Sequence, residues 1–265
     1  MRTRIDHIRI PIAAVAAIAV ALVAVALGCG SSGDNTATAQ PTTSARTTNP
    51  APVHGPYSPT IDPANFVSGV DNRYLPYKPG TTLVYKGVAE NGTTPQADVE
   101  FVTHKTKRIL GVDATVVLDK VSSRGAPIER TYDWYAQDRQ GNVWYFGEDA
   151  SEFKRGHYVR ASDSWEAGVN GAQPGIVMEA HPKQGDAYRQ EYYPGHALDK
   201  GKVLGTAGPI KVPFRTFGTT LSTVETSGLE PGAAEKKYYA AGVGNVLERV
   251  VKGNHERFAL VSVSH

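Results

Sequence analysis

Short apolar runs, rich in β-branched and aromatic side chains, dominate residues 61–265. Gly, Pro, Asn and Asp separate these runs, and no apolar stripe continues at helical spacing for more than two turns. Runs of this kind, bounded by turn residues, are typical of β-strands. The predicted strands span 82–89, 98–109, 112–121, 128–136, 143–147, 187–193, 197–204, 210–214, 219–227, 234–240, 244–251 and 257–263. Twelve strands at this spacing predict an all-β fold, an antiparallel meander that curls into a half-barrel or barrel.

Two turns in this pattern have a clear physical basis. Leu110-Gly111-Val112 joins two apolar runs, and 138–142 places Gly141 and Asn142 where a tight hairpin requires positive φ. Because side chains alternate along a strand, Asp133 and Tyr135 are predicted to share one face and Trp134 the other.

The first 29 residues have the layout of an export signal. Arg2, Arg4 and Arg9 precede an apolar stretch over 10–27. The sequence Ala26-Leu27-Gly28-Cys29 then resembles a bacterial lipobox, in which the cysteine thiol carries a diacylglycerol. It departs from that pattern because the lipobox prefers Leu three residues before the cysteine and a small residue two before. An uncleaved signal anchor therefore stays open as the alternative.

Cysteine usage favours the lipidated form. Cys29 is the only cysteine of the chain, so it cannot form an intramolecular disulfide. Acyl chains on Cys29 would provide a stable membrane anchor. We predict a cell-membrane lipoprotein whose folded domain lies on the extracytoplasmic side.

Composition divides the rest of the chain into a linker and one domain. Residues 30–60 are mainly Ser, Thr, Ala, Pro, Gly and Asn, which predicts a flexible tether. Residues 61–265 are long enough for a single β domain. Residues 1–28 contain three basic side chains and one acidic side chain, so their removal brings the formal net charge from +2 to about zero. That balance gives no basis for predicting nucleic-acid binding.

Aromatic and acidic side chains concentrate between residues 132 and 193, where all three tryptophans lie. Rings with a few polar groups are typical of small-molecule pockets, but aromatic core pairs within a sheet explain the same composition. The candidate ligand-binding residues are Asp133, Trp134, Tyr135, Trp144, Glu148, Trp165, Met178, Arg189, Glu191 and Tyr193. Residues 165–178 are predicted to be a long loop over this cluster, carrying Trp165 and Met178.

Several motifs resemble a family of uncharacterised secreted bacterial lipoprotein domains. They include Tyr132-Asp133-Trp134-Tyr135-Ala136-Gln137-Asp138, Gly141-Asn142-Val143-Trp144-Tyr145-Phe146-Gly147-Glu148, and Lys237-Tyr238-Tyr239-Ala240 with Gly242-Val243-Gly244. The resemblance runs from about Asn72 onward and implies no mechanism. The last motif is also similar, at the level of fold, to lipoprotein-carrier-like half-barrels, which bind lipids or lipoprotein acyl chains against a curved sheet.

Other chemistry finds little support in the sequence. The histidines are scattered without metal-ligand spacing, and 138–142 is explained by a hairpin turn, so neither a metal nor a cofactor is predicted. Asp133 with Glu148, or Glu148 with Glu191, are the carboxylate pairs that could act in glycoside hydrolysis. No catalytic residue is predicted, because such carboxylates are more often solvated or paired with an arginine such as Arg189.

These features favour a non-catalytic module that binds a hydrophobic or amphipathic ligand. Two alternatives remain open. The first is a secreted hydrolase acting on envelope carbohydrate, and the second is a protein-interaction domain that uses an exposed sheet edge.

The anchor can be tested with Cys29→Ala in the native host. We expect the wild-type protein to incorporate labelled palmitate and the variant to lose the label, because no thiol remains to be acylated. Ser31→Ala, two residues away, should keep the label. A wild-type protein that stays in the membrane fraction uncleaved and unlabelled would show that the apolar segment itself is the anchor.

Overall fold

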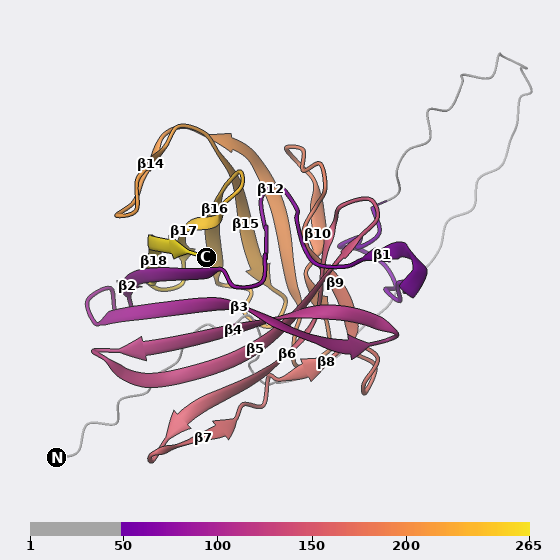
Figure 1. Cartoon of the computed structure of the whole chain (residues 1–265), viewed down its shortest axis with the longest axis horizontal. Coiled ribbons are helices and arrows are strands. Elements are labelled where there is room, and N and C mark those ends of the chain that lie inside the picture. Colours follow the sequence, from indigo (N-terminus) through magenta and orange to yellow (C-terminus); the bar gives the residue numbers. More distant parts are fainter. Residues whose placement is uncertain (1–48) are drawn as a thin grey trace, which may run out of the picture.

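The computed structural model describes residues 49–265, and strands make up nearly all of their regular structure (Figure 1). The predictions for the signal segment, for Cys29 and for most of the linker lie outside the described residues. A 3-10 helix, Pro63–Asn65, precedes the main strands. Within 49–265 no helix has the length and apolar character of a membrane span.

One antiparallel sheet forms the body of the molecule. Sixteen strands belong to it, while β13 and β14 pair separately. The strands are β1 Phe66–Val67, β2 Thr82–Val88, β3 Pro95–Ile109, β4 Val112–Ser123, β5 Ala126–Asp138, β6 Val143–Lys154, β7 His157–Arg160, β8 Trp165–Glu166, β9 Gln173–Met178, β10 Ala187–Arg189, β11 Glu191–Tyr192, β12 Asp199–Ala207, β13 Ile210–Lys211, β14 Thr216–Phe217, β15 Thr220–Ser227, β16 Ala234–Ala240, β17 Gly244–Lys252 and β18 Arg257–Ser264.

The order of strands around the sheet is β10-β12-β15-β16-β17-β18-β2-β3-β4-β5-β6-β9-β11. Both halves are meanders, because β2 to β6 and β15 to β18 each pair with their sequence neighbours. The pairing of the last strand, β18, with β2 joins the two meanders.

A single residue of chain connects the two ends of this order. β10 ends at Arg189 and pairs with β12, whereas β11 begins at Glu191 and pairs with β9. Between them, the Gln190 N–H donates to the Asp199 carbonyl at 2.8 Å. A sheet whose terminal strands are consecutive in the chain must curl around, and it does so to form a nearly closed barrel (Figure 1).

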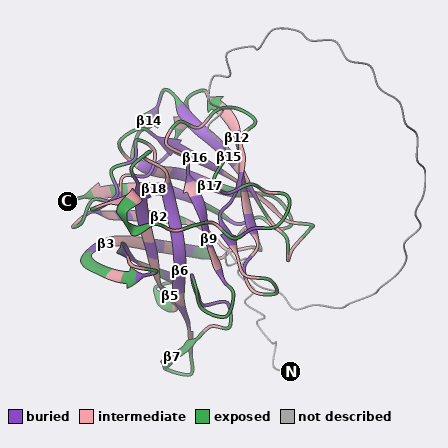
Figure 2. Ribbon diagram, turned by 90° about the vertical axis from the view of Figure 1, so that its right-hand side faces the viewer, coloured by how far each residue is buried: buried purple, intermediate pink, exposed green. Residues whose placement is uncertain are grey.

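Apolar side chains form two clusters in this frame. The larger contains Trp134, Phe146 and Ile176, and the smaller contains Val246 and Leu260. Buried positions run along the central strands (Figure 2). The first six residues of β6 are all buried, so this strand is covered on both faces.

The predicted all-β, curled antiparallel architecture is confirmed. Each of the twelve predicted strands overlaps at least one observed strand. Both hairpins are confirmed: Leu110 and Gly111 have φ angles of 49° and 82°, and the Asp138 N–H donates to the Asn142 carbonyl at 3.0 Å. In the second hairpin only Gly141, with φ 96°, takes the positive φ that was also expected of Asn142.

The predicted loop over 165–178 is wrong at both ends. Trp165–Glu166 and Gln173–Met178 are strands β8 and β9, and both pair with β6. The sequence pattern did not predict β9 because the strand contains Pro174 and Gly175, and both residue types are typical of loops.

The end of the predicted linker packs on the domain. Ala51 is fully buried, and the Tyr57 hydroxyl donates to the Pro174 carbonyl at 2.6 Å. Pro52 forms an isolated bridge with Tyr188 of β10. The folded domain therefore includes residues 49–60.

Barrel closure can be tested with Gly175→Ala, because a Cβ at Gly175 would lie only 2.4 Å from the Arg189 carbonyl oxygen. The overlap is with backbone, so we expect the free energy of unfolding to fall by about 2 kcal/mol or more. Gly208→Ala is the control, since a Cβ at Gly208 meets nothing within 4 Å. Equal urea midpoints for the two variants would contradict a tight junction.

Candidate ligand-binding cavity

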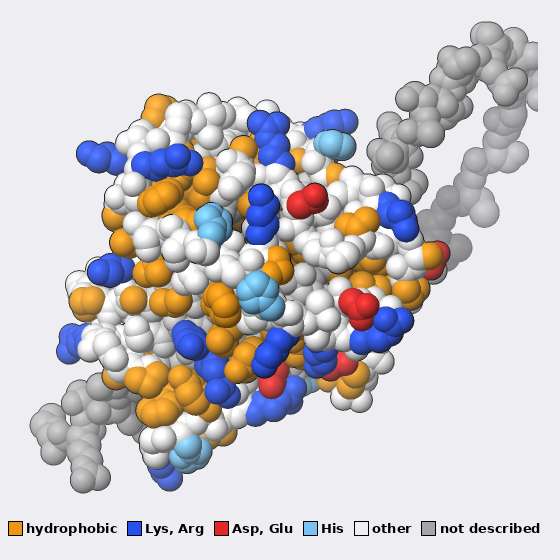
Figure 3. All heavy atoms as spheres, viewed as in Figure 1, with side chains coloured by type: hydrophobic (Ala, Val, Ile, Leu, Met, Phe, Trp, Pro, Cys, Tyr) orange, Lys and Arg blue, Asp and Glu red, His pale blue; other side chains and the backbone are white. Residues whose placement is uncertain are grey.

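The inner face of the curled sheet lines a cavity of about 190 Å³ that is partly open to solvent and has largely acidic walls. Eleven of its lining residues carry a carboxyl group and one, Lys237, carries a cation. The acidic residues are Asp98, Glu100, Asp119, Glu129, Asp133, Glu148, Asp163, Glu225, Glu235, Glu248 and Glu256. By contrast, Lys and Arg outnumber Asp and Glu among the charged side chains on the face shown in Figure 3. The acidic side chains thus gather around the cavity, whereas basic side chains predominate among the charges on this outer face.

Strand register places several carboxyl groups directly opposite one another. Glu100 of β3 pairs with Asp119 of β4, and Asp133 of β5 pairs with Glu148 of β6. Like charges in directly opposite positions are destabilising. The sheet therefore favours a proton or a cation between the members of each pair.

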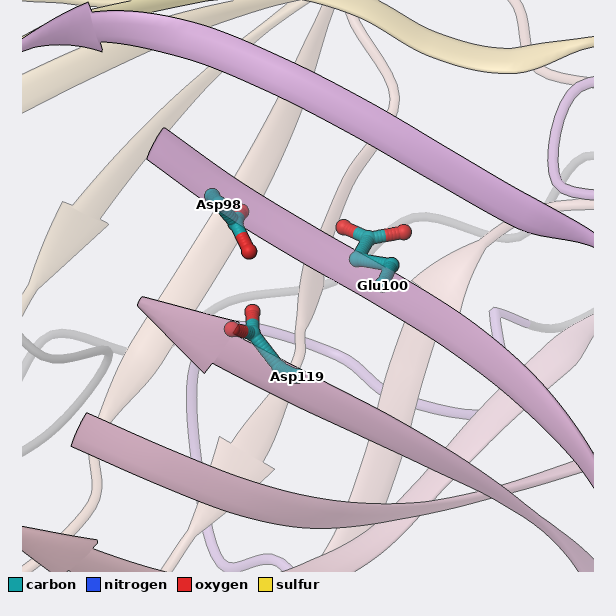
Figure 4. Close-up of side chains that lie close together, drawn as sticks. All are labelled: Asp98, Glu100 and Asp119. Atoms are coloured by element: carbon teal, nitrogen blue, oxygen red, sulfur yellow. The ribbon is translucent and has the colours of Figure 1, made fainter. Parts of the chain in front are cut away.

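The β3–β4 group includes a third carboxylate. The carboxyl groups of Asp98 and Asp119 face each other, with Glu100 beside them on β3 (Figure 4). One oxygen from each of the three lies within 4.8 Å of the others. This all-oxygen set could hold a hard divalent ion such as Ca²⁺.

A bulge in β6 turns Glu148 into the cavity. Tyr135 pairs with Tyr145 and Asp133 pairs with Glu148, so β6 uses one residue more than β5 over this interval. Gly147, with φ 122°, lies in this interval, and a Cβ there would meet the Trp165 carbonyl oxygen at 2.3 Å. The extra residue lets Tyr145 and Glu148 line the same cavity.

Tyr145 links the two opposing carboxyl groups. Its hydroxyl lies 2.7 Å from Asp133 Oδ1 and 2.9 Å from Glu148 Oε2. The hydroxyl has one hydrogen to donate, so both contacts are hydrogen bonds only when one carboxyl group is itself protonated.

Burial makes this protonation favourable. It raises the pKa of Asp133 to about 8, with Asp119 acting in the same direction and the Tyr145 hydrogen bond opposing. Burial and then Asp133 likewise raise the pKa of Glu148 well above its usual value. The pair therefore holds a proton near neutral pH when no cation is bound.

Lys237 neutralises another part of the wall. Its Nζ lies 2.9 Å from Glu225, 3.6 Å from Glu235 and 4.0 Å from Glu248. Burial lowers the pKa of Lys237, but Glu225 and Glu235 outweigh that effect and the net pKa is raised, so the ammonium stays charged.

Tyrosine rings form the third part of the wall. The Tyr135 ring centroid lies 4.9 Å from both the Tyr77 and the Tyr145 centroids, and the Tyr135–Tyr145 pair is stacked. Trp165 meets Tyr145 edge-on at 5.4 Å. Burial raises the pKa of all three tyrosines, which therefore remain neutral phenols.

Three of the candidate ligand-binding residues line this cavity, namely Asp133, Tyr135 and Glu148. Trp165 supports the wall through Tyr145. Tyr193 lies elsewhere and stacks on His196.

The remaining candidates have structural contacts. Trp134, Trp144 and Met178 belong to the larger apolar cluster, and Met178 is fully buried. Arg189 donates to the carbonyls of Pro52 and Gly55, which fastens residues 49–60 to β10. Glu191 is fully buried next to the cavity, and burial followed by Asp199 and Glu148 raises its pKa.

Sequence reasoning missed most of the acidic wall. Asp98 and Glu100 share a face by alternation within one predicted strand, a signal that could have been read. Their meeting with Asp119, and with Lys237 from the opposite side of the barrel, depends on register and closure.

Comparisons with known proteins identify no family. No family model matches the chain, and no curated protein matches it. The resemblance stated from the motifs therefore stays a prediction.

Two solved structures show partial likeness. One is a candidate exported protein with a YmcC-like fold from Bacteroides fragilis, with 12% identity and a TM-score of 0.38. The other is a candidate lipoprotein from Parabacteroides distasonis, with 10% identity and a TM-score of 0.37. Each alignment covers 73% of this chain and 100% of the other. Likeness at this level carries no argument about function.

The proton on the Asp133–Glu148 pair should make stability depend on pH. With a folded-state pKa of about 8 against an ordinary 3.8, Asp133 keeps in the folded protein a proton that the unfolded chain loses. The free energy of unfolding should therefore fall as pH rises from 4 to 8. Asp199, whose pKa burial raises to about 7, adds to this trend.

Urea unfolding of Asp133→Asn measures the effect. We expect the loss of stability between pH 5 and 8 to shrink by roughly 1–2 kcal/mol relative to wild type, because the amide cannot ionise. Asp113→Asn, at a side chain that is 61% exposed, is the control and should keep the wild-type slope. An unchanged slope in Asp133→Asn would contradict the assignment of the proton.

Proposed function

We propose that this protein is an extracytoplasmic, lipid-anchored binding module that holds a small amphipathic ligand inside its barrel. The export signal and Cys29 support the location. The cavity inside the curled sheet, with tyrosine rings beside polar groups, supports the binding role.

Unsatisfied polar atoms in the cavity wall are the observation that carries this proposal. Glu148 and Gln190 are only 7% and 4% exposed, and Glu148 Oε1 and Gln190 Oε1 have no hydrogen-bond partner. Leaving such an atom unsatisfied costs about 1–3 kcal/mol. A bound molecule would remove that cost, and the polar wall favours an amphipathic ligand over a purely apolar one.

The geometry favours binding over glycoside hydrolysis. Asp133 and Glu148 are the closest match to the carboxylate pair that such chemistry requires. However, the Tyr145 hydroxyl lies between them and contacts both, at the place where a sugar carbon would have to react.

Closure of the sheet also weakens the interaction-domain alternative. Strand addition needs a long free edge. Here β10 and β11, the ends of the strand order, are only three and two residues long and are consecutive in the chain.

Native mass spectrometry of protein purified from its own host tests the proposal. We expect a small molecule to accompany the wild-type protein and to be released on denaturation. Ala150→Leu adds bulk to the cavity wall and should abolish this mass, whereas Ala126→Leu, at an exposed position, should retain it. Urea midpoints should confirm that both variants fold. Recovery of no small molecule with any wild-type preparation would overturn the proposal.

A further inference from the structure

The polar atoms that lack partners at the cavity wall are all hydrogen-bond acceptors. They belong to Glu148, Asp163, Gln190 and Asn245, and each is an oxygen. Acceptors are satisfied by a ligand that donates hydrogen bonds. A donor that is also positively charged would fit a wall with eleven carboxyl groups and one lysine.

Lys237 shows how the cavity accommodates an alkylammonium group. The Lys237 side chain ends in a primary ammonium group. Its Nζ lies within 4.0 Å of carboxylate oxygens of Glu225, Glu235 and Glu248. An ammonium offers three donors on a compact charge. Asp133 and Glu148 offer carboxyl groups in the same cavity. No Lys or Arg of the described chain makes an ion pair with either of them.

The Asp133–Glu148 pair has the components of an ammonium site. Two carboxyl groups lie on either side of Tyr145, and Glu148 Oε1 is buried at the cavity wall with no partner. The stacked rings of Tyr135 and Tyr145 line the same cavity. Aromatic rings stabilise organic cations, whereas a hard metal ion gains little from them.

We propose that the ligand is a small amine, with its ammonium group held by Asp133 and Glu148 and its carbon chain against the tyrosine rings. This inference rests on the proposed binding function and names its ligand class. It also gives the opposing carboxyl groups the cation that their register favours.

Amine binding should release a proton, because the ammonium replaces the hydrogen shared by the pair. The titratable groups that face Asp133 are Tyr77, Glu100, Asp119, Glu129, Tyr135, Tyr145, Glu148 and Lys237, and Glu148 is also faced by Asp163 and Glu191. Only Lys237 among them is a cation, and it is already paired with Glu225. Because the pair loses a proton when the amine binds, the affinity for the amine should increase as pH rises from 6 to 8.

Calorimetric titration with n-butylamine, n-butanol and butyrate tests the ligand class, because the three probes share a chain length and differ in the polar group. We expect butylamine to bind, with a heat that depends on the ionisation enthalpy of the buffer, and the other two not to bind. Glu148→Gln should weaken butylamine at least about tenfold. Glu152→Gln, farther along β6 and half-exposed, should bind like wild type.

Several outcomes would overturn the amine assignment. Binding of butanol or butyrate with no binding of butylamine would do so while leaving the binding function intact. So would CaCl₂ that binds and excludes butylamine. If native mass spectrometry recovers a ligand that has no amino group and no probe binds, the amine assignment fails and the binding function stands. If neither experiment finds a ligand, both proposals fail.

Discussion

Closure of the sheet through Gln190 is the constraint on which the interior depends. β10 and β11 belong to opposite ends of the strand order, yet one residue separates them in the chain. The chain can satisfy both pairings only if the whole sheet curls round, and Gly175 allows the backbone to approach closely at the junction. Curling turns one face of β3 to β6 towards β16, so that carboxyl groups on the first side meet Lys237 from the other.

The acidic interior that results lowers the free energy of unfolding. Buried carboxyl groups are costly unless they are neutral, paired or bound to a cation. The protein uses two of these solutions in different places. Lys237 pairs with Glu225, whereas Asp133 and Glu148 lie around the Tyr145 hydroxyl with pKa values raised by burial. An apolar interior would avoid the cost, and the acidic wall therefore supports the proposal of a bound ligand.

Some of this could be predicted from sequence, and the reasons for success and failure are physical. Alternation places Asp133 and Tyr135 on one face, and both line the cavity. Glu148 is different, because simple alternation from Tyr145 would turn it outward, and only the bulge with Gly147 brings it in. A register shift of one residue reverses the facing of every later side chain. Trp134 and Met178 illustrate the opposite error, since apolar residues in an aromatic cluster are core here.

The central claim is that the cavity's opposing carboxyl groups hold a proton until a cation replaces it. Carbon-13 NMR of the side-chain carboxyl groups, followed against pH with Asp133→Asn to assign the signal, measures this directly. We expect the Asp133 signal of the free protein to titrate near pH 8 and to move to lower pH when butylamine is present. A titration near pH 4 in the free protein, unchanged by the amine, would contradict the account.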